Sequence, residues 1–158
     1  MTEHSEDIHH GNTTTICIVG IGNRLRADDG VGAYVCELIE KQQLPGVSFV
    51  ITQQLDTVLI EELIQFNSVI FIDAAVNSKG LSFLPVADMQ QAPQSFSHHI
   101  NAAMLVGLAK ELFAARTQFY ICAIGIDNIE MGNQLSAITK ANANDAVVFI
   151  TEWIQNNN

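Results

Sequence analysis

Alternation between apolar, β-branched runs and helix-patterned segments is the feature that most constrains how this chain can fold. Three runs are β-branched or apolar at almost every position, as is typical of strands buried on both faces of a parallel sheet. They are TTTICIVG (13–20), SVIFIDAA (68–75) and TQFYICAIG (117–125). VSFVITQ (47–53) and LSFLPV (81–86) predict two further strands.

Helix-like segments separate these strands. The predicted helices span residues 30–42, Thr57 to about Phe66, 100–116, and Ser136 to near Trp153. Asp56 is expected to cap the second of them, and the polar stretch Asp88–Ser97 predicts a loop. Strands spaced by helices favour a mostly parallel sheet with right-handed crossovers. We therefore predict an α/β fold, a single-domain three-layer sandwich whose mostly parallel, twisted five-stranded sheet carries helices on both faces.

Size and charge set further limits. The 158 residues fit one domain, which we place at 13–158 after a disordered, polar tail at 1–12 containing His4, His9 and His10. No apolar signal core and no membrane span is present in the sequence, so we expect a cytoplasmic monomer without membrane contact. The net charge of −10 excludes general nucleic-acid binding. The three cysteines, without any CxxC pair, predict buried reduced thiols.

The segment after the first strand, GIGNRLRADDGVG (20–32), is the first candidate site. Gly20 and Gly22 permit a tight turn, but Leu25 stands where a dinucleotide fingerprint needs glycine, and no Walker lysine follows. The loop instead presents Asp28 and Asp29 just before a helix. These acids are candidate ligands, with helix capping and interaction with the helix dipole as the structural alternative.

Two more features accompany later strands. Asp73 ends the third strand, where a loop cap or a ribose-binding acid are alternatives, and His98 and His99 lie between the fourth strand and its helix. We expect all of them at the carboxyl ends of strands, where α/β sheets gather their binding loops. Two carboxylates and one imidazole would make a site for a divalent transition metal, without selecting among nickel, zinc, iron and manganese.

The first motif resembles the opening signature of the hydrogenase maturation proteases, GxGNxLxxDDGxG. Four later segments resemble that family's other motifs: QQLDTVLIEEL (53–63), IDAA (72–75), SHHINAAML (97–105) and GNQLS (132–136). In all, the resemblance covers about residues 14–154. One departure is Ala27, which replaces a glycine that is common in the family.

The resemblance implies that Asp29, Asp73 and His98 are the catalytic, metal-holding residues, with His99 as the alternative to His98. His98 is preferred because the family has an apolar residue two places later, here Ile100. Gly22, Asn23 and Asp28 are then expected to bind substrate.

The implied activity is an endopeptidase that removes the C-terminal extension of a nickel-loaded [NiFe] hydrogenase large-subunit precursor. The nickel is carried by the substrate, and zinc or cadmium would serve as a surrogate. No GxSxG elbow and no HExxH helix appears in the sequence. The alternatives are a non-proteolytic metal- or nucleotide-binding α/β module and a nickel sensor or chaperone.

Overall fold

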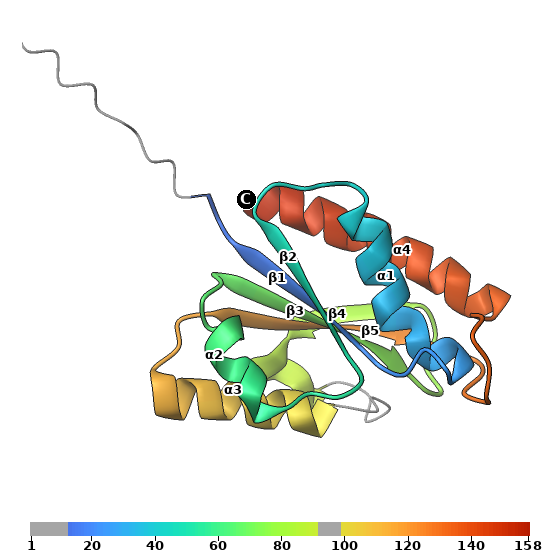
Figure 1. The fold of residues 1–158 in the computed structure, drawn as a ribbon, viewed down its shortest axis with the longest axis horizontal. Coiled ribbons are helices and arrows are strands. Elements are labelled where there is room, and N and C mark those ends of the chain that lie inside the picture. The colour runs from blue at the N-terminus through green and yellow to red at the C-terminus, as the bar shows by residue number, and fades with distance from the viewer. Residues whose placement is uncertain (1–12, 92–98) are drawn as a thin grey trace, which may run out of the picture.

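A five-stranded sheet forms the centre of the molecule (Figure 1). The computed structural model describes residues 13–91 and 99–158, with side chains described outside 89–101; the predicted tail at 1–12 lies outside the described residues. The strands are β1 (Ile16–Ile21), β2 (Val47–Thr52), β3 (Ser68–Ala75), β4 (Leu81–Pro85) and β5 (Gln118–Gly125). Their order is β2-β1-β3-β5-β4, and only β4 pairs antiparallel, which confirms the predicted fold class.

Helices cover both faces of the sheet (Figure 1). The helices α1 (Val31–Glu40) and α4 (Ala137–Asn157) pack on one face, and α2 (Ile60–Leu63) and α3 (His99–Phe113) on the other. Short 3-10 helices precede three of them: η1 (Ala27–Gly30), η2 (Thr57–Leu59) and η3 (Val86–Gln91). Among the described residues, no helix is long and apolar enough to cross a membrane.

Several predicted boundaries are corrected. The helix expected to reach Phe66 is a 3-10 turn followed by one α-helical turn, although Asp56 caps it as predicted by accepting from the Val58 amide. The last helix runs past Trp153 to Asn157, because no glycine or proline interrupts it and Ile154 is buried. The predicted loop at 88–97 begins inside η3, and its remainder from residue 92 lies outside the described part of the chain.

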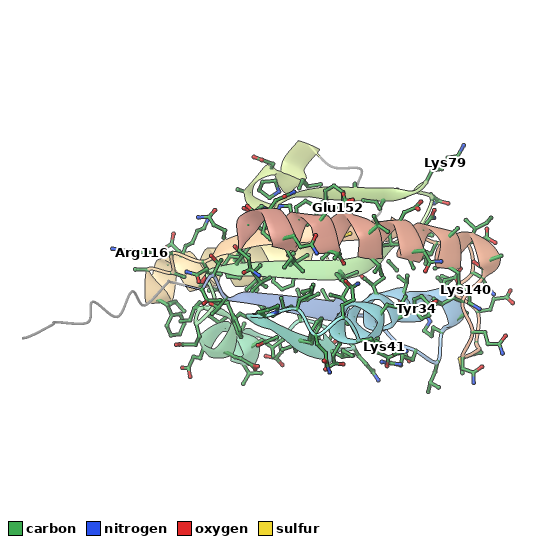
Figure 2. All side chains as sticks on the ribbon, turned by 90° about the horizontal axis from the view of Figure 1, so that it is seen from above. Tyr34, Lys41, Lys79, Arg116, Lys140 and Glu152 are labelled. Atoms are coloured by element: carbon green, nitrogen blue, oxygen red, sulfur yellow. The ribbon has the colours of Figure 1, made fainter. Side chains whose placement is uncertain are left out.

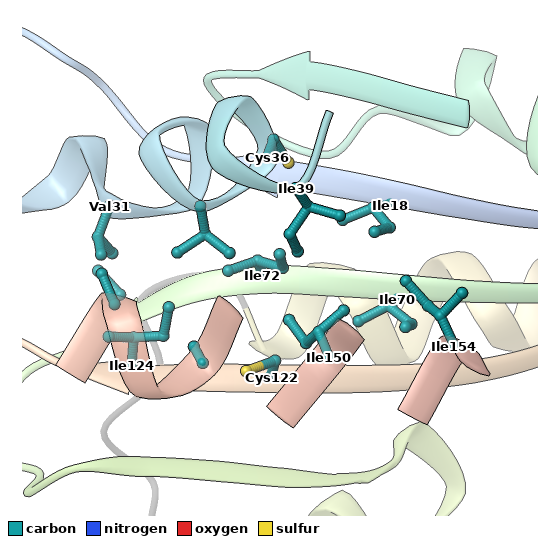
Figure 3. Close-up of a cluster of buried hydrophobic side chains, with 14 of the residues drawn as sticks. Ile18, Val31, Cys36, Ile39, Ile70, Ile72, Cys122, Ile124, Ile150 and Ile154 are labelled. Atoms are coloured by element: carbon teal, nitrogen blue, oxygen red, sulfur yellow. The ribbon is translucent and has the colours of Figure 1, made fainter. Parts of the chain in front are cut away.

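Two apolar cores lie on opposite faces of the sheet because successive strand residues point to opposite sides. Isoleucines of β1, β3 and β5 face α1 and α4, as Figure 3 shows for Ile18, Ile70 and Ile124. Val19 and Phe71 face the α2 and α3 side. Charged side chains such as Lys79 and Arg116 extend away from these cores into solvent (Figure 2).

The cysteines belong to these cores. Cys17, Cys36 and Cys122 are buried free thiols, as predicted. Burial raises the pKa of each thiol to about 12, so all three stay protonated near neutral pH.

Candidate functional site

The loop after β1 is folded around the backbone and carboxylate of Asp29. Gly22 has φ +136°, and a Cβ there would collide with the Asp29 carbonyl oxygen, so only glycine fits this turn. The amide of Asn23 donates to the Asp29 Oδ2 at 2.8 Å, and the Asn23 Oδ1 accepts from the Leu25 amide at 2.9 Å. Asp29 is 9% exposed. Gly22 and Asn23 therefore fix the position of this largely buried carboxylate.

Asp28 has a different environment, because it is fully buried. Its Oδ2 accepts from the Asp127 and Asn128 amides at 3.0 and 2.7 Å. Its Oδ1 accepts from the Ser136 amide at 2.6 Å, and the Ser136 hydroxyl donates to Oδ2 at 2.8 Å. This carboxylate ties η1 to the loop after β5 and to the start of α4.

Electrostatics agree with that anchoring role. Desolvation by burial raises the pKa of Asp28, but the hydrogen bonds from Ser136, Asn128 and Thr139 together outweigh it and hold the pKa below its usual value. The N-cap part of the structural alternative is wrong, since the N-cap of α1 is Gly30 and no side chain caps η1 or α1, although both acids do lie in the first turn of η1. The geometry does not support the expected contact of Asp28 with substrate.

Ala27 keeps the conformation that a glycine would favour. Its φ is +47°, a left-handed value that costs a non-glycine residue roughly 1 kcal/mol. The Ala27 amide donates to the Gly132 carbonyl at 2.7 Å, and the Gly132 amide donates to the Leu25 carbonyl at 2.9 Å. The segment containing GNQLS thus pairs with the first motif and fixes its shape despite the missing glycine.

Asp73 lies within β3 and is fully buried. The Ala74 amide donates to its Oδ1 at 2.9 Å. Asp73 follows Val69 and Phe71 at spacings of two residues, so the pleat directs it to the same face as these two residues, which belong to the core under α2 and α3. The pairing of β1 with β3 ends at Ile72, so Asp73 is one residue beyond the last paired position.

Close packing of α1 brings Asp29 to the same end of the sheet as Asp73. A Cβ on Gly32 would lie 2.7 Å from the Ile72 carbonyl oxygen and 2.8 Å from the Ile21 amide nitrogen. The start of α1 therefore contacts the ends of β1 and β3 directly. We call this end, where β1, β2, β3 and β5 terminate, the carboxyl edge of the sheet.

The helix that follows the histidine segment approaches this edge by a route that the sequence analysis did not predict. The end of β4 lies at the opposite edge, because β4 is antiparallel to β5. The helix α3 instead runs back toward the start of β5, so it begins near the carboxyl edge (Figure 1). His98 lies outside the described residues, and His99 is the first residue of α3.

A pocket adjoins the loop that holds Asp29. It has a volume of about 210 Å³ and lies between residues 22–25 and residues 51–53 at the end of β2. Leu25 and Ile51 are exposed at its rim. Within the described side chains, which include neither that of His98 nor that of His99, no group of three potential metal-ligating residues is assembled.

The sequence analysis missed the residues that hold Asp28. Asn128 and Ser136 donate mainly from their backbone amides, and this role does not depend on residue type, so the sequence does not reveal it. The available signal was Ser136, whose hydroxyl accepts from the Thr139 amide and caps α4.

Comparison with known proteins places this fold. No family model matches the chain, and no curated protein is similar to it in sequence. Among solved structures, the hydrogenase maturating endopeptidase HybD from E. coli matches with a TM-score of 0.76 and 15% identity, over 91% of this chain and 94% of that one.

Two archaeal structures are also similar. The [NiFe] hydrogenase maturation protease HybD from Thermococcus kodakarensis gives a TM-score of 0.69 at 17% identity, over 89% of this chain and 99% of that one. A hydrogenase 2 maturation peptidase from a Thaumarchaeota archaeon gives 0.64 at 23% identity, over 90% and 99% of the respective chains. The chain has the fold of the hydrogenase maturation proteases.

Proposed function

We propose that this protein is an endopeptidase that removes the C-terminal extension of a nickel-loaded [NiFe] hydrogenase large-subunit precursor. The observation that carries the proposal is the Asp29 carboxylate, held by the Asn23 amide in a loop shaped for it, at the same sheet edge as Asp73. The shared fold with proteins named as hydrogenase maturation proteases supports the substrate class.

In this proposal the nickel belongs to the substrate. Asp29, Asp73 and one histidine, His98 or else His99, supply two oxygens and one nitrogen to it, a donor set suited to a divalent transition metal. Zinc or cadmium would bind the same donors as a surrogate. A metal held jointly by enzyme and precursor orients the scissile bond, which lowers the entropic cost of reaching the reactive geometry.

The test uses the nickel-loaded precursor from the same cell, with mass spectrometry of the large subunit before and after incubation. We expect one cut that releases a short C-terminal peptide, while nickel-free precursor and casein stay intact. Asp29→Ala should lower the processing rate by about 100-fold or more. The exposed acid of α4 provides the matched control Asp145→Ala, which should process normally.

The same assay assigns the histidine, since His98→Ala should slow processing more than His99→Ala. The reverse order would move the ligand to His99. Equal cleavage of nickel-free and nickel-loaded precursor would refute metal recognition. Absence of cleavage by the wild-type protein would defeat the peptidase assignment and leave a non-proteolytic metal- or nucleotide-binding module.

A further inference from the structure

The edge strand β2 offers unpaired backbone groups beside the candidate site. Within the part of the chain that the structure describes, β2 pairs only with β1, and no strand lies beyond it. Its exposed side chains are Ser48 and Ile51. A strand edge of this kind is a template for pairing with another extended segment.

The register shows which groups of β2 face outward. The Ile16 amide donates to the Gly46 carbonyl at 2.9 Å, and the Gly22 amide donates to the Thr52 carbonyl at 3.0 Å. In a parallel ladder, alternate residues of a strand bond to the same neighbour. Ser48, Val50 and Thr52 therefore bond to β1, whereas the amides and carbonyls of Val47, Phe49 and Ile51 point away from the sheet.

This outward edge leads into the pocket that adjoins Asp29. Ile51, 47% exposed, and Leu25, 62% exposed, contribute apolar surface to the pocket. Asn23, whose amide binds the Asp29 carboxylate, lines the same pocket. A peptide paired with β2 would thus have its side chains in contact with the pocket and its backbone directed to the loop that presents Asp29.

We infer that the C-terminal extension of the substrate binds as an added strand along the free edge of β2, with an apolar side chain between Leu25 and Ile51. This inference rests on the proposed function. An extended tail is the favoured occupant because an endopeptidase must hold an extended backbone beside its site, and backbone pairing fixes it with little demand on its sequence. The net charge of −10 favours a neutral or basic tail.

Proline at position 51 tests the edge without removing a bond of the sheet. Ile51→Pro deletes an outward amide, and proline is tolerated at such positions on edge strands. Ile51→Ala removes the side chain but keeps the amide. We expect Ile51→Pro to lower kcat/KM for the nickel-loaded precursor at least tenfold more than Ile51→Ala does, mainly through KM, because both variants lose the side-chain contact but only proline also loses the outward amide.

Amide exchange in the wild-type protein supplies a second measurement that needs no substitution. The probe is a synthetic peptide that spans the cleavage site and the C-terminal extension of the precursor, with the scissile bond reduced. It should slow exchange at the Phe49 and Ile51 amides, which face outward, while Val50 stays protected with or without peptide. Protection of Phe49 and Ile51 at high protein concentration without peptide would show pairing with a second copy instead and overturn the inference.

The outcomes separate the two proposals. Wild-type cleavage with equal kcat/KM for Ile51→Pro and Ile51→Ala, or unchanged exchange at Phe49 and Ile51 with bound peptide, overturns the edge proposal and leaves the peptidase intact. No cleavage of any precursor by the wild-type protein overturns the peptidase and the edge proposal together.

Discussion

Asp28 and Asp29 are neighbours in sequence whose carboxylates differ in environment. Asp28 is fully buried and its carboxylate accepts hydrogen bonds from Asp127, Asn128 and Ser136, whereas Asp29 keeps 9% exposure and accepts from the Asn23 amide. This contrast indicates that Asp28 anchors the loop and agrees with the proposal that Asp29 takes part in the chemistry. A variant at each position therefore separates stability from activity.

We expect Asp28→Asn to destabilise the fold by about 2–4 kcal/mol, because the side-chain nitrogen of asparagine cannot accept the hydrogen bonds that the backbone amides now donate to the carboxylate. The pH dependence follows from the lowered pKa of Asp28. Its contribution to stability is fully present above the unfolded value of about 3.9 and is lost as the pH falls through the folded pKa. In urea unfolding measured from neutral to strongly acidic pH, the free energy of unfolding should fall less steeply with falling pH for Asp28→Asn than for wild type.

Asp29→Asn is the matched control, with wild-type stability near neutral pH expected within about 1 kcal/mol. If both variants lose the same stability, the distinction between the two acids is incorrect. The sequence could predict an important acid pair but not which acid was structural. The partners of Asp28 lie about 100 residues away and donate mostly from the backbone.

At the scale of elements, the approach of α1 to the sheet depends on Gly32. A Cβ at this position would lie 2.7–2.8 Å from backbone atoms of Ile72 and Ile21, none of which is a flexible side-chain end. We expect Gly32→Ala to destabilise the protein by roughly 2 kcal/mol or more and to displace Asp29 from Asp73. Gly107 in α3 is the control, because a Cβ there meets nothing within 4 Å.

Gly107→Ala should stabilise the protein by about 0.5–1 kcal/mol, since alanine restricts the unfolded chain and favours helix. Thermal unfolding of both variants checks the pair. A Gly32→Ala protein as stable and as active as wild type would show that α1 can withdraw without disturbing the site.

The hydrophobic pattern predicts that β4 is a strand but does not give its direction in the sheet. The strands themselves were predictable because the buried runs are continuous and apolar. The antiparallel direction of β4 was also readable, since only residues 76–80 separate it from β3. A parallel return needs a crossover of a dozen or more residues. The expectation that β4 ends beside Asp73 was wrong for this reason, whereas α3, which begins at His99, starts near that end of the sheet.

For the whole molecule, the layered core determines which chemistry is available. The three thiols are distributed over both cores, with Cys17 on one face of the sheet and Cys36 and Cys122 on the other. Burial raises their pKa values to about 12, so neither an exposed thiol nor a thiolate is available as nucleophile. Processing should therefore be independent of cysteine alkylation.

The folded protein is treated with iodoacetamide near neutral pH, separated from the reagent so that the precursor's own cysteines stay intact, and then assayed. We expect unchanged processing and no added mass, because alkylation requires the thiolate and access to it. The same reagent in concentrated guanidinium should add three carbamidomethyl groups, one for each cysteine of the chain. Loss of processing together with a single modified cysteine in the folded protein would identify a reactive thiol and exclude a mechanism that uses only carboxylates and histidine.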